Sequence, residues 1–179
     1  MPRVVRLRML LTLFLCCSLV AYADGNVFKN VRYNGGSIAS NVSPKDWGNT
    51  LTVTPTLTTL DLKGKPKTHF EIPSQSITGL SYGQEAHRRV GTMIALAILV
   101  APVALFGLLH KTRLHYIGVQ YKLADGTTGG ILLQGDKSNY RAILVALQGV
   151  SGAAVSVSDK EREYIPVGVK AEPTKAEAK

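Results

Sequence analysis

Cysteine is almost absent from the sequence, which excludes several kinds of chemistry at once. The chain has 179 residues and only two cysteines, Cys16 and Cys17. Both lie in a segment that has the features of a secretory signal peptide, as described below. The remainder of the chain would then contain no cysteine, so disulfides, thiol catalysis and cysteine-ligated zinc are excluded there.

The sequence also lacks the basic pattern of a nucleic-acid-binding protein. It has 21 basic and 12 acidic residues, but no arginine-rich stripe interleaved with aromatic residues. Without residues 1–23 the basic residues number 18, because three arginines lie in that segment. This modest excess is weak evidence for nucleic acid, and we expect no such partner. Anionic lipid is the more natural source of counter-charge.

The four histidines do not form a metal-binding pattern. The chain has no H-E-x-x-H motif, and no histidine pair has zinc-helix spacing with a carboxylate between its members. We therefore expect no metal and no cofactor. One histidine is expected on the solvent side of a strand, and two flank an apolar segment. The histidines are His69, His87, His110 and His115.

Residues 1–23 have the three regions of a secretory signal peptide. Three arginines at the start form a basic region, residues 9–15 are apolar, and Ala21-Tyr22-Ala23 is a small-x-small cleavage motif. We predict cleavage between Ala23 and Asp24. A retained transmembrane helix is the alternative, but residues 9–22 are short against the ~20 residues that a spanning helix needs. Export would place the protein in the periplasm or cell envelope, most naturally at the inner membrane.

Alternating apolar and β-branched residues predict a series of short strands. Pro55 interrupts one long alternating run, so two strands or a bulged edge are expected there. Asp125-Gly126 is a strong hairpin signal. The expected strands comprise residues 27–33, two between 50 and 63, 68–72, 76–82, 114–123 and 130–134.

A helix is expected after these strands, followed by a mobile tail. Ser138 is a candidate N-cap, and apolar residues at i, i+3, i+4 and i+7 form one stripe over 140–147. Gly149 is placed to end the helix near Gln148. Residues 159–179 are rich in Lys, Glu, Ala and Pro, a composition typical of a flexible tail.

Residues 90–109 are the one long apolar run outside the signal segment. These 20 residues have no charge and, as a helix, would be ~30 Å long, the thickness of a bilayer's hydrocarbon core. We predict an inserted membrane helix, which either spans the bilayer or dips into it from one side. Basic residues flank the run and are either interfacial anchors or lipid or anion contacts. They are Arg88, Arg89, Lys111 and Arg113.

Several short motifs resemble a group of exported bacterial proteins of unassigned function with a pleckstrin-homology-like (GRAM-like) domain. Phe70-Glu71-Ile72-Pro73 followed by Ser76-Ile77-Thr78 is similar to a strand pair of that domain. The end of the closing helix, Leu147-Gln148-Gly149, is also similar. Further motifs of the group are Tyr33-Asn34-Gly35-Gly36, Tyr82-Gly83-Gln84, Arg88-Arg89-Val90-Gly91, Ala104-Leu105-Phe106 and His115-Tyr116.

The resemblance implies a mainly β fold: an antiparallel pleckstrin-homology-like sandwich or barrel over residues 24–158, with one C-terminal amphipathic helix and the inserted apolar helix. It implies no catalytic residues. The expected function is that of a non-catalytic, membrane-associated module of the cell envelope. Its partners would be membrane lipid and a peptide or protein.

A small serine hydrolase is the alternative function. Gly79-Leu80-Ser81-Tyr82-Gly83 matches the G-x-S-x-G nucleophile elbow. In hydrolases of that fold an acid and then a histidine follow the serine. Here three aspartates lie after the last histidine, His115, and Glu85 is too close to Ser81 to orient an imidazole that must reach it. The order of residues therefore argues against catalysis.

Overall fold

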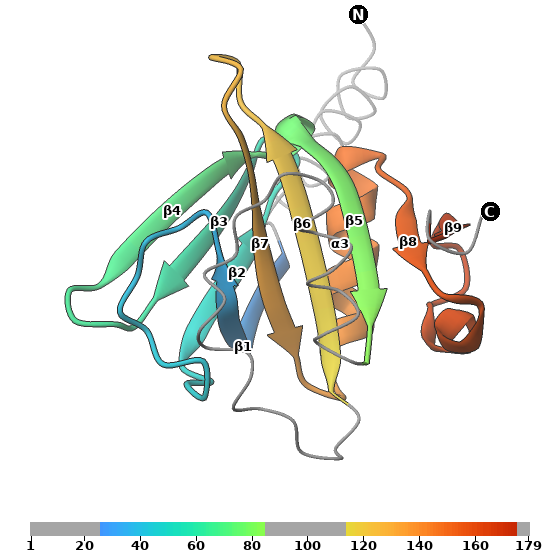
Figure 1. The fold of residues 1–179 in the computed structure, drawn as a ribbon, viewed down its shortest axis with the longest axis horizontal. Helices are drawn as coiled ribbons and strands as arrows, with labels where there is room; N and C mark the ends of the chain where they lie inside the picture. Colours follow the sequence, from blue (N-terminus) through green and yellow to red (C-terminus); the bar gives the residue numbers. More distant parts are fainter. Residues whose placement is uncertain (1–25, 85–113, 175–179) are drawn as a thin grey trace, which may run out of the picture.

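The computed structural model describes residues 26–84 and 114–174, which form one mixed sheet of nine strands and an α-helix (Figure 1). The strand order is β4-β3-β2-β1-β7-β6-β5-β8-β9. The strands are β1 (Asn26–Gly36), β2 (Asn49–Val53), β3 (Leu57–Leu62), β4 (Thr68–Pro73), β5 (Ile77–Gly83), β6 (His115–Lys122), β7 (Thr128–Gly135), β8 (Val155–Val157) and β9 (Ala171–Pro173). The helix is α3 (Tyr140–Ser151), and two 3-10 helices are η1 (Ser74–Ser76) and η3 (Asp159–Tyr164).

The strands predicted from alternation between residues 27 and 134 are confirmed. Pro55 separates β2 from β3, because a proline cannot donate a hydrogen bond to a neighbouring strand. The turn is closed by the Thr54 hydroxyl, which donates to the Leu57 carbonyl at 2.7 Å and accepts from the Leu57 amide at 2.9 Å. In β2 and β3 the apolar residues alternate into the core, with Leu51, Leu60 and Leu62 buried.

Strand β1 belongs to both halves of the sheet because it changes partner along its length. Its first half pairs with β2 and its second half with β7, and the register shifts between Phe28 and Val31. Asn30 has a φ of 58°, in the left-handed region that asparagine tolerates better than most residues. The bend lets the two halves of the sheet approach each other. Phe70 of β4 contacts Tyr121 of β6, with ring centroids 5.8 Å apart.

The predicted amphipathic helix is confirmed as α3, with different ends. Asn139 precedes the helix, and the Asp136 carboxylate accepts hydrogen bonds from the Ser138 and Asn139 amides. The chain continues helically through Gly149 and leaves the helix at Gly152, where φ is 69°. The predicted stripe faces the core and consists of Tyr140, Ile143, Leu144 and Leu147.

The prediction of an antiparallel pleckstrin-homology-like sandwich or barrel is wrong. The nine strands form one mixed sheet that is not closed, with β4 at one edge and β9 at the other. After β7 the chain crosses through α3 and returns as β8, parallel to β5, and β9 then pairs parallel with β8. A connection through a helix brings a strand back in the same direction, which a hairpin cannot do.

The chain beyond Ser158, where composition suggested a mobile tail, continues into η3 and β9 in the described region. Val155 and Val157 of β8 are buried, and β9 covers their outer edge through parallel pairs such as Val155 with Ala171. A strand of three residues has too little alternation to be seen in a sequence that is mostly charged or small.

No membrane-spanning helix is found among residues 26–84 and 114–174. The α-helix in this part of the chain, α3, has 12 residues, and none of the described helices is long and apolar enough to cross a bilayer. The expected fold included an inserted apolar helix, and the described part of the fold contains no such helix. Residues 90–109 and the signal segment 1–23 lie outside the described residues.

Candidate functional site

A polar cluster of the described structure lies where β5 ends and β6 begins. Tyr82 of β5 and His115 of β6 are joined by a hydrogen bond of 2.8 Å between the Tyr82 hydroxyl and His115 Nδ1. Tyr140, the first residue of α3, stacks on His115 with ring centroids 3.8 Å apart and an interplanar angle of 2°. Three elements therefore meet in one stack of rings.

Burial and local charge both favour the neutral form of His115. The side chain is only 7% exposed, and this burial is the main cause that lowers its pKa. The nearby cations of Lys137 and Arg141 lower the pKa further, while Asp136 opposes them. Burial raises the pKa of Tyr82, so its hydroxyl stays protonated beside the imidazole.

A buried carboxylate holds the end of β5 against the C-terminal part of the chain. Glu161 of η3 accepts a hydrogen bond from the Gln84 amide at 2.6 Å through one oxygen. Its other oxygen accepts from the Ser158 hydroxyl at 2.7 Å. Gln84 directly follows the last residue of β5, so its hydrogen bond to Glu161 fixes the position at which the chain leaves the sheet.

Ser81 does not occupy a nucleophile elbow. It lies inside β5, between Gly118 of β6 and Ser156 of β8, and the strand continues to Gly83. An elbow instead places its serine in a sharp turn between a strand and a helix, with the hydroxyl exposed. The Ser81 side chain is 3% exposed, and its buried hydroxyl has no hydrogen-bond partner in the described part of the chain.

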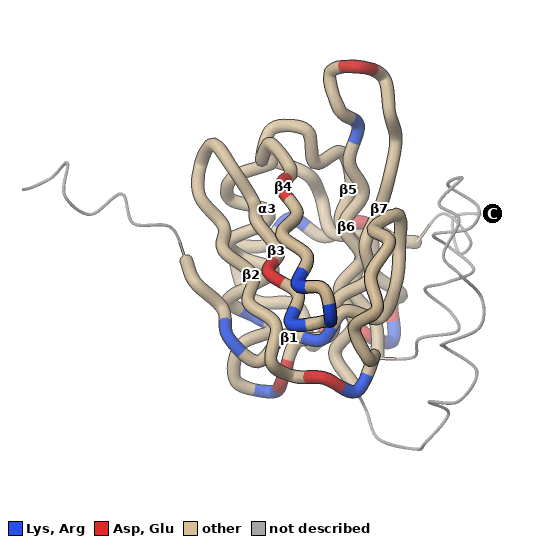
Figure 2. Tube along the Cα trace, turned by 90° about the vertical axis from the view of Figure 1, so that its left-hand side faces the viewer, with Lys and Arg blue, Asp and Glu red and all other residues tan. Residues whose placement is uncertain are grey.

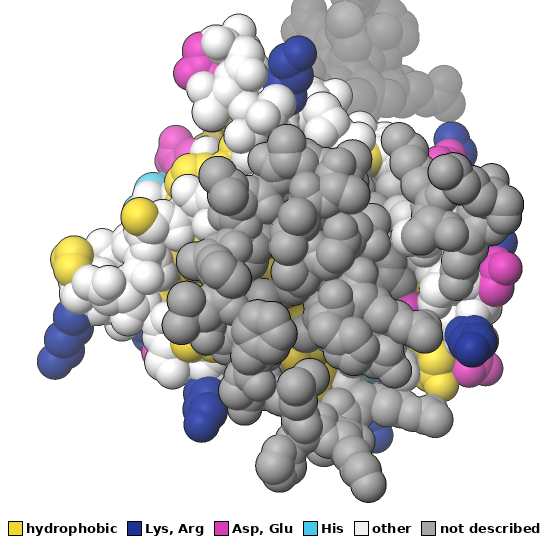
Figure 3. Space-filling view, viewed as in Figure 1, with side chains coloured by type: hydrophobic (Ala, Val, Ile, Leu, Met, Phe, Trp, Pro, Cys, Tyr) yellow, Lys and Arg dark blue, Asp and Glu magenta, His cyan; other side chains and the backbone are white. Residues whose placement is uncertain are grey.

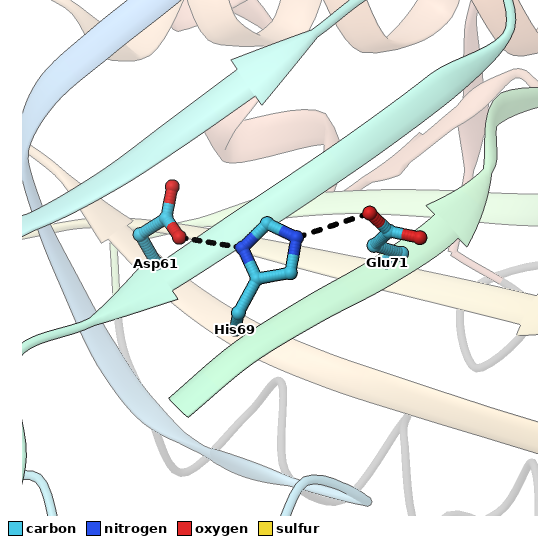
Figure 4. Close-up of polar contacts among 3 residues, drawn as sticks. All are labelled: Asp61, His69 and Glu71. Carbon is cyan, nitrogen blue, oxygen red and sulfur yellow. Dashed lines mark hydrogen bonds and ion pairs between the residues drawn. The ribbon is translucent and has the colours of Figure 1, made fainter. Parts of the chain in front are cut away.

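His69 lies on the solvent side of β4, as predicted, and it bridges two carboxylates (Figure 4). Its Nδ1 is 2.6 Å from Asp61 of β3, and its Nε2 is 3.0 Å from Glu71, two residues along β4. These hydrogen bonds, first to Asp61 and then to Glu71, raise the pKa of the imidazole. Within residues 26–84 and 114–174, no group of three or more His, Cys, Asp or Glu side chains could hold a metal ion.

The predicted lipid or anion contacts cannot be placed in this site. Arg88, Arg89, Lys111 and Arg113 lie outside the described residues, as do the predicted cleavage residues Ala23 and Asp24. The structure does bring together the positions that precede and follow them. Gly83 pairs with Tyr116, so Gln84 and His115 lie at neighbouring positions at one end of the sheet.

Sequence reasoning missed the stack of Tyr82, His115 and Tyr140. No local motif links these residues, which are separated by 33 positions and then 25, and only the pairing of β5 with β6 brings the first two together. The bridge at His69 had a clearer signal. Asp61 and His69 flank the turn after β3 at equal distances, so a hairpin there pairs them directly.

Comparisons with known proteins do not add a relative. No family model matches the chain, no curated protein matches it, and no solved structure matches it. The resemblance to exported proteins of unassigned function therefore stays a prediction.

Proposed function

We propose that the protein is a non-catalytic, membrane-associated module of the bacterial cell envelope, in which the sheet lies against one face of the inner membrane. The observation that carries this proposal is the pairing of β5 with β6 on either side of residues 85–113. Five successive pairs join the two strands, from Gly79 with Gln120 to Gly83 with Tyr116, and Ile77 pairs with Tyr121 beyond a shift in register.

This pairing argues against a chain divided by the bilayer. Strands that exchange backbone hydrogen bonds must lie on the same side of a membrane, because a sheet cannot pair through hydrocarbon. The chain therefore leaves the sheet at Gln84 and returns at Leu114, at the same end. Any membrane contact made between these points would hold the whole sheet against one face.

The sequence of the connection supplies the reason to expect a membrane. Residues 90–109 have no charged side chain, and Arg88, Arg89, Lys111 and Arg113 stand on both sides of them. Exposure of such a run to water costs free energy, roughly 25 cal/mol per Å² of apolar surface. Contact with lipid removes that cost, and the flanking cations suit the headgroup region.

The surroundings of Ser81 support a binding module over a hydrolase. Its hydroxyl is enclosed between two neighbouring strands, with no histidine bonded to it among the described residues. Of the described histidines, His115 lies at the end of the neighbouring strand β6, and its Nδ1 is already hydrogen-bonded to the Tyr82 hydroxyl. A nucleophile needs both access and a base, and this serine has neither in the described structure.

Membrane fractionation of the full chain in bacteria tests the proposal. We expect the protein in the membrane fraction after a carbonate wash, and we expect the double variant I98D/L105D in the soluble fraction. The matched control is V145D, which adds charge at a side chain that is 48% exposed on α3 and should stay with the membrane. Release of the unchanged protein by carbonate would overturn the proposal.

Cysteine labelling tests the side of the membrane. In a background with Cys16 and Cys17 changed to Ser, single cysteines replace Thr78 of β5 and Thr128 of β7, both exposed. An impermeant maleimide should label both positions equally in intact cells. Labelling of only one position before lysis would mean a divided chain. Labelling of neither would contradict export to the envelope.

A further inference from the structure

Four exposed lysines of the described structure gather at the end of the sheet from which residue 84 leaves. Three of them lie in the turn between β3 and β4, and Figure 2 shows this concentration of basic residues in front of β1. The fourth lies in the loop between β1 and β2. We call these residues the lysine surface: Lys45, Lys63, Lys65 and Lys67.

Strand registers place the lysine surface and the β5–β6 end on the same side of the sheet. Two rows of paired residues, which meet at neighbouring residues of β1, lead from one to the other. The first row consists of Gly83, Tyr116, Gln134 and Arg32. The second begins with Val31 and Asn49, passes beside the pair of Thr50 with Asp61, and ends with Leu62 and Thr68. The turn at residues 63–67 directly follows this last pair. Lys137 is also exposed at this end, just before α3.

The two loops that supply the lysines are held together. The Lys63 amide donates to the Asn49 side-chain oxygen at 3.0 Å, and Asn49 also donates to the Val31 carbonyl at 3.0 Å. A Cβ added at Gly48 would lie 2.9 Å from Cδ of Lys63, so the backbone of one loop touches the side chain of the other. The cations therefore belong to one surface.

The lysine surface has an excess of positive charge. Among the described residues, none of the four lysines forms an ion pair. One carboxylate, that of Asp46, lies in the same loop and accepts the Gly48 amide at 2.7 Å. At the opposite end of the sheet, the turns at residues 54–56, 74–76 and 124–127 have no lysine or arginine, and one exposed lysine, Lys122, adjoins Asp125 there. In Figure 3 basic side chains project from the left and lower margins of the described surface, and others from its top and right.

An aromatic residue adjoins the lysine surface. Trp47 follows Lys45 and Asp46 in the loop, is partly exposed, and has the Arg32 guanidinium 4.0 Å above its ring. Tryptophan beside cations is typical of the boundary between water and lipid headgroups. It is also the only tryptophan of the chain, which makes it a specific optical probe of this end of the sheet.

We propose that the lysine surface contacts the anionic headgroups of the membrane face against which the sheet lies. This inference rests on the proposed function, and it assigns the face of the sheet that meets the lipid. Charge complementarity selects an anionic bilayer, since each lysine close to such a surface favours contact about five-fold. Two lysines together should contribute on the order of 25-fold, and salt should weaken the effect.

Reconstituted vesicles test this orientation with the full chain. The vesicles consist of phosphatidylcholine alone or of phosphatidylcholine with one quarter phosphatidylglycerol, and both contain a lipid spin-labelled at its headgroup. We expect stronger quenching of Trp47 fluorescence in the anionic vesicles, and loss of this excess in K65Q/K67Q and in high salt. The matched control K122Q/K170Q removes the same charge elsewhere and should keep the excess.

The outcomes separate this inference from the proposed function. Protein that does not float with either kind of vesicle would overturn both. Protein that floats with both, while Trp47 is quenched equally in both, would leave the membrane module standing and overturn the lysine surface. Equal loss of the excess in both double variants would also overturn it, because the effect would then follow net charge and not position.

Discussion

His115 lies flat against Tyr140, and its Nδ1 forms a 2.8 Å hydrogen bond with the Tyr82 hydroxyl. The Tyr82 hydroxyl can donate to this nitrogen or accept from it, so the evidence for a neutral imidazole is the burial and charge around the ring. Burial, Lys137 and Arg141 all lower the pKa of His115, with Asp136 acting in the opposite direction. The ring stack is therefore sensitive to acid.

We predict that acid weakens the fold through His115. Because its pKa is lower folded than unfolded, the unfolded chain binds more protons between that lowered pKa and 6.5. The stabilisation is thus fully present above pH 6.5 and is lost as the pH falls through the folded pKa. Denaturant melts between pH 7.5 and 5 should show this loss, and H115Q should reduce its slope. An unchanged slope in H115Q would contradict the assignment.

We predict the opposite behaviour for His69. Its pKa is raised by Asp61 and then by Glu71, so its contribution is fully present below pH 6.5 and is lost as the pH rises through the raised folded pKa. Proton NMR of the imidazole should give a pKa above 6.5. D61N should lower that pKa more than E71Q does, because Asp61 is the larger cause. An equal effect of the two variants would contradict this order.

The sequence predicted the regular part of the sheet because its pattern repeats over several residues. Leu51, Leu60 and Leu62 alternate with threonines and an aspartate, and they alternate into the core. Such alternation shows that one face is buried, but it does not show which strands are neighbours. The parallel return of β8 beside β5 depends on the crossover through α3, for which no residue of Val155–Val157 gives a signal.

The polar clusters were less predictable than the strands. Asp61 and His69 could have been paired from the hairpin between them, since the register follows from the turn. The stack of His115 on Tyr140 depends on where α3 begins relative to β6, which is a tertiary relationship. The G-x-S-x-G motif also depends on its surroundings, because such a sequence marks a nucleophile elbow only when a turn encloses it. Here it lies inside β5.

Substitution of Gly36 by alanine tests the close approach of β1 to β7, and Gly149 of α3 provides the control. Gly36 has a φ of 140°, and a Cβ there would lie 2.2 Å from the Gly130 carbonyl oxygen. We expect G36A to lower the free energy of unfolding by about 1–3 kcal/mol, since backbone atoms would have to move. In α3, a Cβ at Gly149 meets nothing within 4 Å, so G149A should raise it by about 0.5–1 kcal/mol. Denaturant melts of both variants would measure the difference, and a neutral G36A would contradict the observed approach.

Ser81 provides the last prediction, which concerns stability and catalysis together. Its hydroxyl is buried in β5 without a hydrogen-bond partner among the described residues, and such a group costs about 1–3 kcal/mol. We expect S81A to raise the free energy of unfolding by about 1 kcal/mol, because the change removes the unsatisfied group and leaves the strand pairing intact. An ester-substrate screen on both forms should show no serine-dependent turnover.

Ser74 is the matched control for this substitution, because it is equally buried but fully bonded. Its hydroxyl donates to the Thr54 carbonyl at 2.8 Å and lies 2.9 Å from the Thr58 hydroxyl, which is buried as well. S74A should therefore lower the free energy of unfolding by about 1–2 kcal/mol, since the buried Thr58 hydroxyl and the part-buried Thr54 carbonyl each lose a partner. If S81A destabilised the protein as much as S74A does, the Ser81 hydroxyl would have a partner after all. If S81A instead abolished a measurable esterase activity, the proposal of a non-catalytic module would fail.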